Sequence, residues 1–101
     1  MSGGAALSAA ELRQWLRDES PALLDRRITA VLGCGPRLTD DGATWISFSS
    51  GVGHGRLVRD NDGSSRVTAR RNEDGERLLD ESAPTTTSDQ LDGLVQALTA
   101  P

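Results

Sequence analysis

The sequence predicts an α+β domain of two layers, in which helices cover one face of a four-stranded antiparallel meander and leave the other face in solvent. Three observations lead to this fold class. Apolar residues recur at helical spacing near both ends of the chain. Between Ala43 and Asp80, apolar and polar residues alternate as they do in strands with one buried face. Two turn glycines in that segment, Gly63 and Gly75, lie twelve residues apart, which is a typical spacing for a meander.

We expect a flexible lead over residues 1–6 and a single α+β domain over residues 7–101. Ser8 and Glu11 have the spacing of a capping box, in which each side chain accepts a hydrogen bond from the other residue's backbone N–H at a helix start. The apolar face of the helix that follows comprises Leu12, Trp15 and Leu16.

Pro21 divides the next part of the chain in this prediction. Proline disfavours helical geometry in the residue before it, so the first helix is expected to end near Ser20. Because proline is favoured in the first turn of a helix, a second helix is expected to begin there, with Gly33 just after its end. Its apolar positions recur at helical spacing and are Leu24, Ile28, Val31 and Leu32.

Four short segments then show the alternation of strands. They are Trp45–Ser49, Gly55–Arg59, Arg66–Arg70 and Glu76–Asp80. The side chains expected beneath the helices are Ile46, Phe48, Leu57, Val67, Ala69 and Leu79. Trp45 has the opposite parity and is expected on the uncovered face with Val58 and Leu78, the alternative being that a helical segment covers its strand end.

The last helix is the clearest amphipathic element of the chain. Thr87 together with Gln90 can cap its start, and Ser88 alone is an alternative cap. Its apolar stripe falls at positions i, i+3, i+4 and i+7, which are Leu91, Leu94, Val95 and Leu98.

The charge balance argues against several classes of partner. Eleven basic residues, all arginine, stand against 15 acidic ones, which gives a net charge of −4. Proteins that bind duplex nucleic acid usually carry a basic footprint, so nucleic acid is the weaker partner here. No apolar run approaches the roughly 20 residues of a membrane span. The N-terminal residues lack the basic region of a secretory signal, and the single cysteine fits a reducing compartment, so a cytoplasmic protein is expected.

Two loops, one rich in glycine and one acidic, resemble ligand-binding loops, but we expect both to be ordinary hairpin turns. The Gly51–Gly55 segment leads into a strand rather than a helix, and the chain has no lysine to hold a phosphate. The Asp60–Ser64 segment resembles the start of a calcium loop, but its later ligand positions hold Ser65 and Arg71. We therefore expect no bound metal and no cofactor.

The chain offers little for catalysis. His54 is the only histidine. In a small hydrolase its candidate neighbours would be Ser49, Ser50, Asp60 and Asp62. This hydrolase hypothesis is the least favoured of the three, because a catalytic triad is defined by geometry that the sequence does not give. One histidine and one cysteine are too few for a hydrolytic zinc site. Cys34 follows the C-terminal end of the expected second helix, where the helix dipole does not favour a thiolate. We therefore expect Cys34 to be a small, partly buried residue without reactivity. Taken together, these residues predict that the protein is not an enzyme.

The uncovered sheet face is the most informative surface. By parity it is expected to present Trp45, Arg56, Arg66, Thr68 and Arg70. A tryptophan beside arginines is a common composition for a protein interface, because the ring supplies area and the guanidinium forks bind carboxylates. The plainer interpretation is a solvated face whose charges block edge-to-edge aggregation.

The leading expectation is therefore a small, non-enzymatic intracellular domain that binds another protein, or a second copy of itself as a homodimer, through this face. Its architecture resembles that of small accessory proteins, such as secretion chaperones, adaptors and immunity proteins, and this likeness identifies no site. The alternative is a nucleic-acid-associated regulator that uses the same arginines on phosphates.

Overall fold

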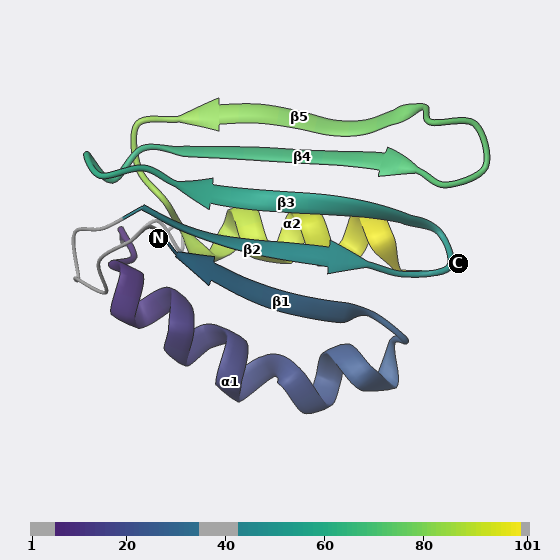
Figure 1. The fold of residues 1–101 in the computed structure, drawn as a ribbon, viewed down its shortest axis with the longest axis horizontal. Coiled ribbons are helices and arrows are strands. Elements are labelled where there is room, and N and C mark those ends of the chain that lie inside the picture. The colour runs from purple at the N-terminus through teal and green to yellow at the C-terminus, as the bar shows by residue number, and fades with distance from the viewer. Residues whose placement is uncertain (1–5, 35–42, 100–101) are drawn as a thin grey trace.

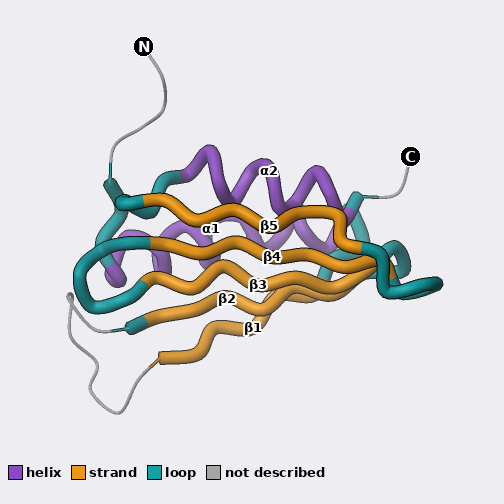
Figure 2. The backbone as a smooth tube through the Cα atoms, turned by 90° about the horizontal axis from the view of Figure 1, so that it is seen from above, coloured by secondary structure: helices purple, strands orange, loops and turns teal. Residues whose placement is uncertain are grey.

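The described chain comprises one helix, a five-stranded antiparallel meander and a second helix (Figure 1). The computed structural model describes residues 6–34 and 43–99. The elements are α1 (Ala9–Asp25), β1 (Thr29–Cys34), β2 (Thr44–Ser49), β3 (Gly53–Arg59), β4 (Ser65–Arg71), β5 (Arg77–Ala83) and α2 (Ser88–Leu98). The strands lie side by side in chain order, and both helices lie on the same side of the sheet (Figure 2). The predicted α+β class, with an antiparallel meander, is confirmed.

One long helix replaces the two predicted near the N-terminus. α1 begins at the predicted capping box, in which Ser8 N donates to Glu11 Oε1 at 3.1 Å and Glu11 N donates to Ser8 Oγ at 3.2 Å. It then continues through Pro21, which is exposed. Proline removes one backbone donor from a helix, and on a solvent-facing side water can satisfy the unpaired carbonyl. The Ser20 hydroxyl also donates to Leu16 O at 2.6 Å, so the turn before the proline keeps an additional hydrogen bond.

The segment expected to be the second helix forms strand β1, so the sheet has five strands rather than four. A turn at Arg26 and Arg27 reverses the chain after α1, with Arg27 at a φ of +59°. Thr29 to Cys34 then pair with Ser49 to Thr44 of β2. The apolar residues of this segment fit both periods, and the ladder offered by β2 decides between them. Gly33 and Cys34 therefore belong to a strand, and neither lies at a helix end.

The predicted core is confirmed. Ile46, Phe48, Leu57, Val67 and Ala69 are buried, and so are all four residues of the α2 stripe. Leu79 is half-buried against this core. Trp15 of α1 packs edge-on against Phe48, with ring centroids 6.2 Å apart at 72°. Each fully buried leucine of the core, such as Leu57, stabilises the folded protein by about 1.5–3 kcal/mol relative to an exposed leucine.

A register shift between Ala69 and Arg70 marks a β-bulge in the pairing of β4 with β5. Ala69 pairs with Leu79, whereas Arg70 pairs with Arg77, so Leu78 is the extra residue of β5. Leu78 and Leu79 both pack against the core. The expectation that Leu78 joins the uncovered face is therefore wrong, because a bulged residue leaves the alternation of its strand.

A close approach between α2 and the sheet depends on Gly55. A Cβ atom built at this position would lie 2.7 Å from Leu94 Cδ1 and 2.6 Å from Thr68 O. Both distances are shorter than van der Waals contact, and the second involves backbone. Leu94 therefore occupies the space that a side chain on β3 would need, which seats α2 directly against the middle of the sheet.

Buried hydrogen bonds fasten the starts of both helices to one end of the sheet. Arg59, only 7% exposed, donates from Nε to Leu7 O at 3.0 Å. Leu7 N in turn donates to Thr86 O at 2.7 Å, just before α2. The hydroxyl of Thr86, which is fully buried, donates to Gly63 O in the β3–β4 hairpin at 3.0 Å. These bonds join the α1 lead, the hairpin and the β5–α2 connection.

Gln90 completes this cluster at the start of α2. Thr87 N donates to Gln90 Oε1 at 3.1 Å, which confirms the predicted pairing of these two residues at the helix start. Gln90 Nε2 donates to Thr85 O at 3.0 Å, and the Ser65 hydroxyl lies 2.9 Å from both Thr85 O and Gln90 Oε1. The first turn of α2 is thereby tied to strand β4.

The tight seat of α2 predicts that Gly55→Ala lowers the free energy of unfolding by about 1–3 kcal/mol, because the added methyl overpacks the contact with Leu94. Urea denaturation measures the change. Gly93→Ala is the matched control, since nothing lies within 4 Å of its built Cβ. Alanine at that helical position should leave stability unchanged or raise it by up to about 1 kcal/mol. Equal effects at the two glycines would contradict the packing argument.

The buried cluster predicts that Arg59→Met lowers the free energy of unfolding by about 1–3 kcal/mol, because Leu7 O loses its charged donor inside the protein. Arg66→Met, on the neighbouring strand with an exposed side chain, should change it by less than about 0.5 kcal/mol. Thermal unfolding of both variants makes the comparison, and a stable Arg59→Met protein would show that the hydrogen bond is dispensable.

Candidate functional site

The sheet face opposite the helices, called the open face below, holds three cross-strand rows of side chains. The first row is Thr29, Ser49, His54, Arg70 and Arg77; the second is Val31, Ser47, Arg56, Thr68 and Asp80; the third is Gly33, Trp45, Val58, Arg66 and Ser82. All five residues predicted for partner binding, Trp45, Arg56, Arg66, Thr68 and Arg70, lie on this one face. Their role in binding stays a prediction.

The open face is positive although the chain as a whole is negative. Among the described residues, its three rows carry four arginines and one carboxylate, that of Asp80. Asp80 lies 3.7 Å from Arg66 and 3.5 Å from Arg77, and such solvent-exposed pairs bind weakly. Two cationic side chains thus share one anion, and the remaining positive charge of the face has no carboxylate partner within the described residues.

Arg56 and Arg70 contact neutral groups. Arg56 Nε donates to Ser47 Oγ across the strands at 3.3 Å, and Arg70 Nη1 donates to Gly75 O of the adjacent turn at 3.1 Å. Neither arginine forms an ion pair with another described residue. A guanidinium has five N–H donors, so each of these two can still bind an oxygen anion in a forked geometry.

A hollow of about 490 Å³ lies across the first two rows of the open face. Its floor is low because the small side chains of Ser47 and Ser49 lie between longer neighbours. His54, Arg56 and Arg70 stand around it, and Val31 closes it toward the β1 edge. The hollow therefore combines hydroxyl and guanidinium donors with one apolar side.

Trp45 lies on the open face, and its ring covers Gly33 of β1. A Cβ atom built at Gly33 would lie 2.8 Å from Trp45 Cζ2 and closer still to Nε1 and Cε2. Only glycine leaves room for the indole there. Because both helices lie on the other side of the sheet, neither α1 nor α2 covers Trp45 (Figure 2), whereas residues 1–5 of the N-terminal lead lie outside the described residues. The ring supplies apolar surface but lies against the backbone of its neighbour.

The residues considered for a hydrolase are brought together only in part: Ser49 of β2 pairs with His54 of β3, and the acidic candidates lie elsewhere. His54 lies near the start of β3, whereas Asp60 and Asp62 follow its other end. His54 Nδ1 is instead 3.2 Å from Asn72 Oδ1, and Asn72 Nδ2 donates to Ser50 O at 2.9 Å. Asn72 thus links two hairpins, a role that sequence reasoning missed because it depends on how the hairpins meet.

Both loops considered for ligands use their polar groups internally. The N–H groups of Val52 and Gly53 donate to Ser50 Oγ at 3.1 and 3.3 Å, so the hairpin does not direct them at an anion. Asp62 Oδ1 accepts bonds from Ser64 N at 2.9 Å and Ser64 Oγ at 2.6 Å. Among residues 6–34 and 43–99, no group of three histidine, cysteine or acidic residues is placed to hold a metal ion.

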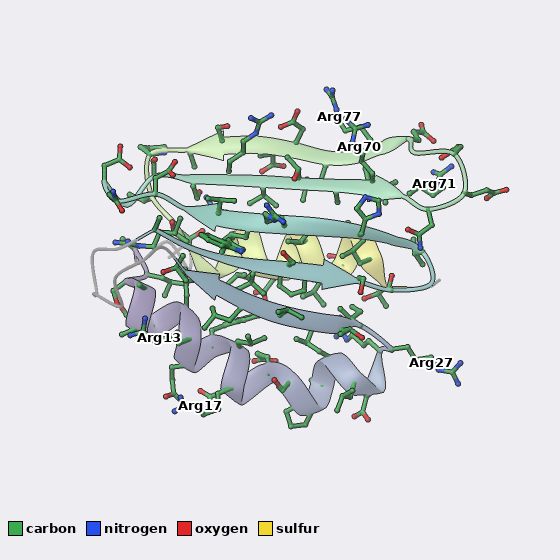
Figure 3. The ribbon with its side chains drawn as sticks, in the orientation of Figure 1. Arg13, Arg17, Arg27, Arg70, Arg71 and Arg77 are labelled. Atoms are coloured by element: carbon green, nitrogen blue, oxygen red, sulfur yellow. The ribbon has the colours of Figure 1, made fainter. Side chains whose placement is uncertain are left out.

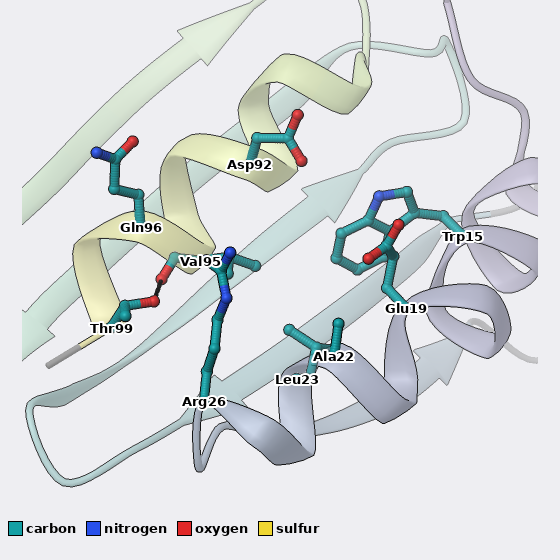
Figure 4. A pocket seen from close by; sticks show the side chains of 9 residues that line it. All are labelled: Trp15, Glu19, Ala22, Leu23, Arg26, Asp92, Val95, Gln96 and Thr99. Carbon is teal, nitrogen blue, oxygen red and sulfur yellow. Dashed lines mark hydrogen bonds between the residues drawn. The ribbon is translucent and has the colours of Figure 1, made fainter.

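A second hollow, of about 670 Å³, separates the two helices on the covered side (Figure 4). Glu19 of α1, Arg26 just after that helix and Asp92 of α2 line it together with the apolar side chains of Trp15 and Val95. Charges of both signs border this hollow, so its electrostatics favour no particular class of ligand. The sequence could not indicate it, because its width depends on the distance between the helices.

Comparisons with known proteins identify no relative: no protein-family model, no curated protein and no solved structure matches the chain. In the described part of the chain, neither helix has the length and hydropathy required to cross a bilayer.

The Asp62 turn predicts a local pH dependence. The Ser64 hydroxyl, followed by the Ser64 N–H, holds the pKa of the Asp62 carboxyl below its usual value. Because the folded pKa is the lower one, the turn's stabilisation is complete above the unfolded pKa and is lost as the pH falls through the folded pKa. Ser64→Ala should raise the pKa of Asp62 in an NMR titration, whereas Ser49→Ala should not change it. An unchanged pKa in Ser64→Ala would assign the shift to another group.

Proposed function

We propose that this chain is a non-enzymatic protein-binding domain whose open face receives an acidic segment of a partner protein. The observation that carries the proposal is the charge of that face: four arginines and a single aspartate on a chain of net charge −4. A positive surface on a negative protein attracts an acidic partner and orients it, while the remaining surface repels it.

The chemistry of the hollow supports a carboxylate-bearing ligand. Arg56 and Arg70 line it without carboxylate partners among the described residues, and bidentate bonds between guanidinium and carboxylate are stronger than neutral hydrogen bonds. The hydroxyls of Ser47, Ser49 and Thr68 add donors of moderate strength. Trp45 and Val58, on the neighbouring row, offer apolar contact to the same segment.

Nucleic acid is less well served by this surface. Single-stranded RNA and DNA are usually held by aromatic rings on which bases stack. Trp45 is the only tryptophan, tyrosine or phenylalanine in the three rows, and its ring lies against Gly33. The proposal therefore places the protein among small cytoplasmic accessory proteins, in the broad manner of chaperones, adaptors and immunity proteins.

The test uses a synthetic peptide in which glutamate alternates with valine, and the same peptide with glutamine. Isothermal titration should show tighter binding of the glutamate peptide. The double variant Arg56→Gln with Arg70→Gln should weaken that binding roughly tenfold or more, because each lost guanidinium leaves a carboxylate unpaired.

The matched control is Arg17→Gln with Arg27→Gln, which removes the same charge at α1 and the turn after it, away from the labelled Arg70 (Figure 3). Its affinity for the glutamate peptide should change by less than about twofold, since these are distant exposed charges. Equal affinity for the two peptides, or equal losses in both double variants, would refute the proposal. Tighter, steeply salt-dependent binding of a single-stranded oligonucleotide would favour the nucleic-acid alternative.

A further inference from the structure

The two edge strands of the sheet differ sharply in charge. β5 contains Arg77, Asp80 and Glu81, and charged side chains on an edge discourage another strand from pairing with it. β1 contains only threonine, alanine, valine, leucine, glycine and cysteine. Among the described residues, no further strand pairs with its outer backbone N–H and C=O groups, and β1 itself has no charged side chain to discourage strand addition.

Exposed apolar side chains concentrate beside this same edge. The large hydrophobic residues exposed in the described chain are Leu24, at 71%, and Val31, at 61%. Val31 stands on the open face of β1. Leu24 lies near the end of α1, the helix that runs along β1 at the margin of the sheet (Figure 1). Both faces of the β1 edge thus present apolar surface to solvent.

A small hollow opens between α1 and β1. It has a volume of about 200 Å³ and is bordered mainly by the apolar side chains of Leu23, Leu24, Ile28 and Ala30, with Ser20 and Thr29 completing it. It lies on the helix side of the strand, beside Ala30, whose small side chain leaves the space open. A larger apolar side chain from an added strand would fit there.

We infer that β1 pairs in antiparallel fashion with β1 of a second copy of this chain, about a twofold axis through Val31, to form one continuous ten-stranded sheet. In this register Val31 meets Val31 of the other copy, Thr29 meets Gly33, and Ala30 meets Leu32. The axis is perpendicular to the sheet, so both copies keep their helices on the same side.

Side-chain chemistry favours a second copy as the occupant. Leu32 of the other copy comes opposite Ala30, where it can fill the hollow under α1. Thr29 of the other copy comes opposite Gly33, beside the ring of Trp45. In this register, each residue of β1 in the second copy comes opposite a position of the first copy that has room for its side chain.

Charge complementarity points the same way. A strand that pairs with its own copy brings like charges near one another across the axis, and β1 carries none. An acidic segment, as proposed for the open face, would find no cation in this strand. Pairing would bring α1 next to α1 of the second copy, with Leu24 near that boundary, and would join the two open faces into one surface.

The first experiment measures mass by sedimentation equilibrium over a wide concentration range. The natural chain should dimerise reversibly, and Val31→Lys should be monomeric at concentrations where the natural chain is dimeric. Val31 is exposed, so the variant should fold with unchanged circular dichroism. Ser82→Lys is the matched control, because it adds the same charge on the open face of β5 and should leave the dimer intact.

The second experiment tests the register. In a Cys34→Ser background, Val31→Cys should form an intermolecular disulfide on mild oxidation. Residues directly opposite each other in an antiparallel ladder have Cα atoms about 4.5–5.5 Å apart, within the range of a disulfide. Ser82→Cys in the same background, on the opposite edge, should remain a monomer after oxidation.

A natural chain that stays monomeric at every concentration would overturn the inference. So would a dimer that survives Val31→Lys, or one that fails to cross-link through residue 31. The result is separable from the proposed function, because sedimentation and cross-linking measure assembly of the chain without any peptide, whereas titration of the natural chain measures peptide binding.

Discussion

The bond from the buried Arg59 side chain to Leu7 O anchors the arrangement of both layers. It joins Leu7, two residues before α1, to β3, and Leu7 N then donates to Thr86 O, just before α2. Both helices are thereby held at the same end and on the same face of the sheet. Because both helices lie on one side of the sheet, no described element covers the other side, and the side chains there can contact solvent or a partner.

The sheet illustrates which parts of the fold local sequence can specify. Alternation from Trp45 onward predicts four strands and six core residues, of which five are buried and Leu79 is half-buried, since only one register of each strand hides its apolar set. The start of α1 and the pairing of Thr87 with Gln90 were equally predictable, because both depend on residues three apart. The placement of Trp45, Arg56 and Arg70 on one face followed from parity alone.

Features that depend on long-range contacts could not be predicted. Val31 and Leu32 satisfy both a helical and an extended period, and the competition was settled by β2, whose position the local sequence does not reveal. Pro21 was taken as a helix breaker, yet its exposed position on α1 tolerates the missing donor. The hollow on the open face, the ring of Trp45 over Gly33 and the contact of His54 with Asn72 all require neighbours from other strands.

The β-bulge at Leu78 has an electrostatic consequence. By taking one residue out of the alternation, it lets two successive leucines contact the core while Arg77 remains opposite Arg70. Their guanidinium groups turn toward different acceptors, because Arg70 Nη1 donates to Gly75 O at 3.1 Å and Arg77 Nη1 lies 3.5 Å from Asp80 Oδ2. The irregularity in the ladder thus leaves two cationic residues side by side while each has an acceptor of its own.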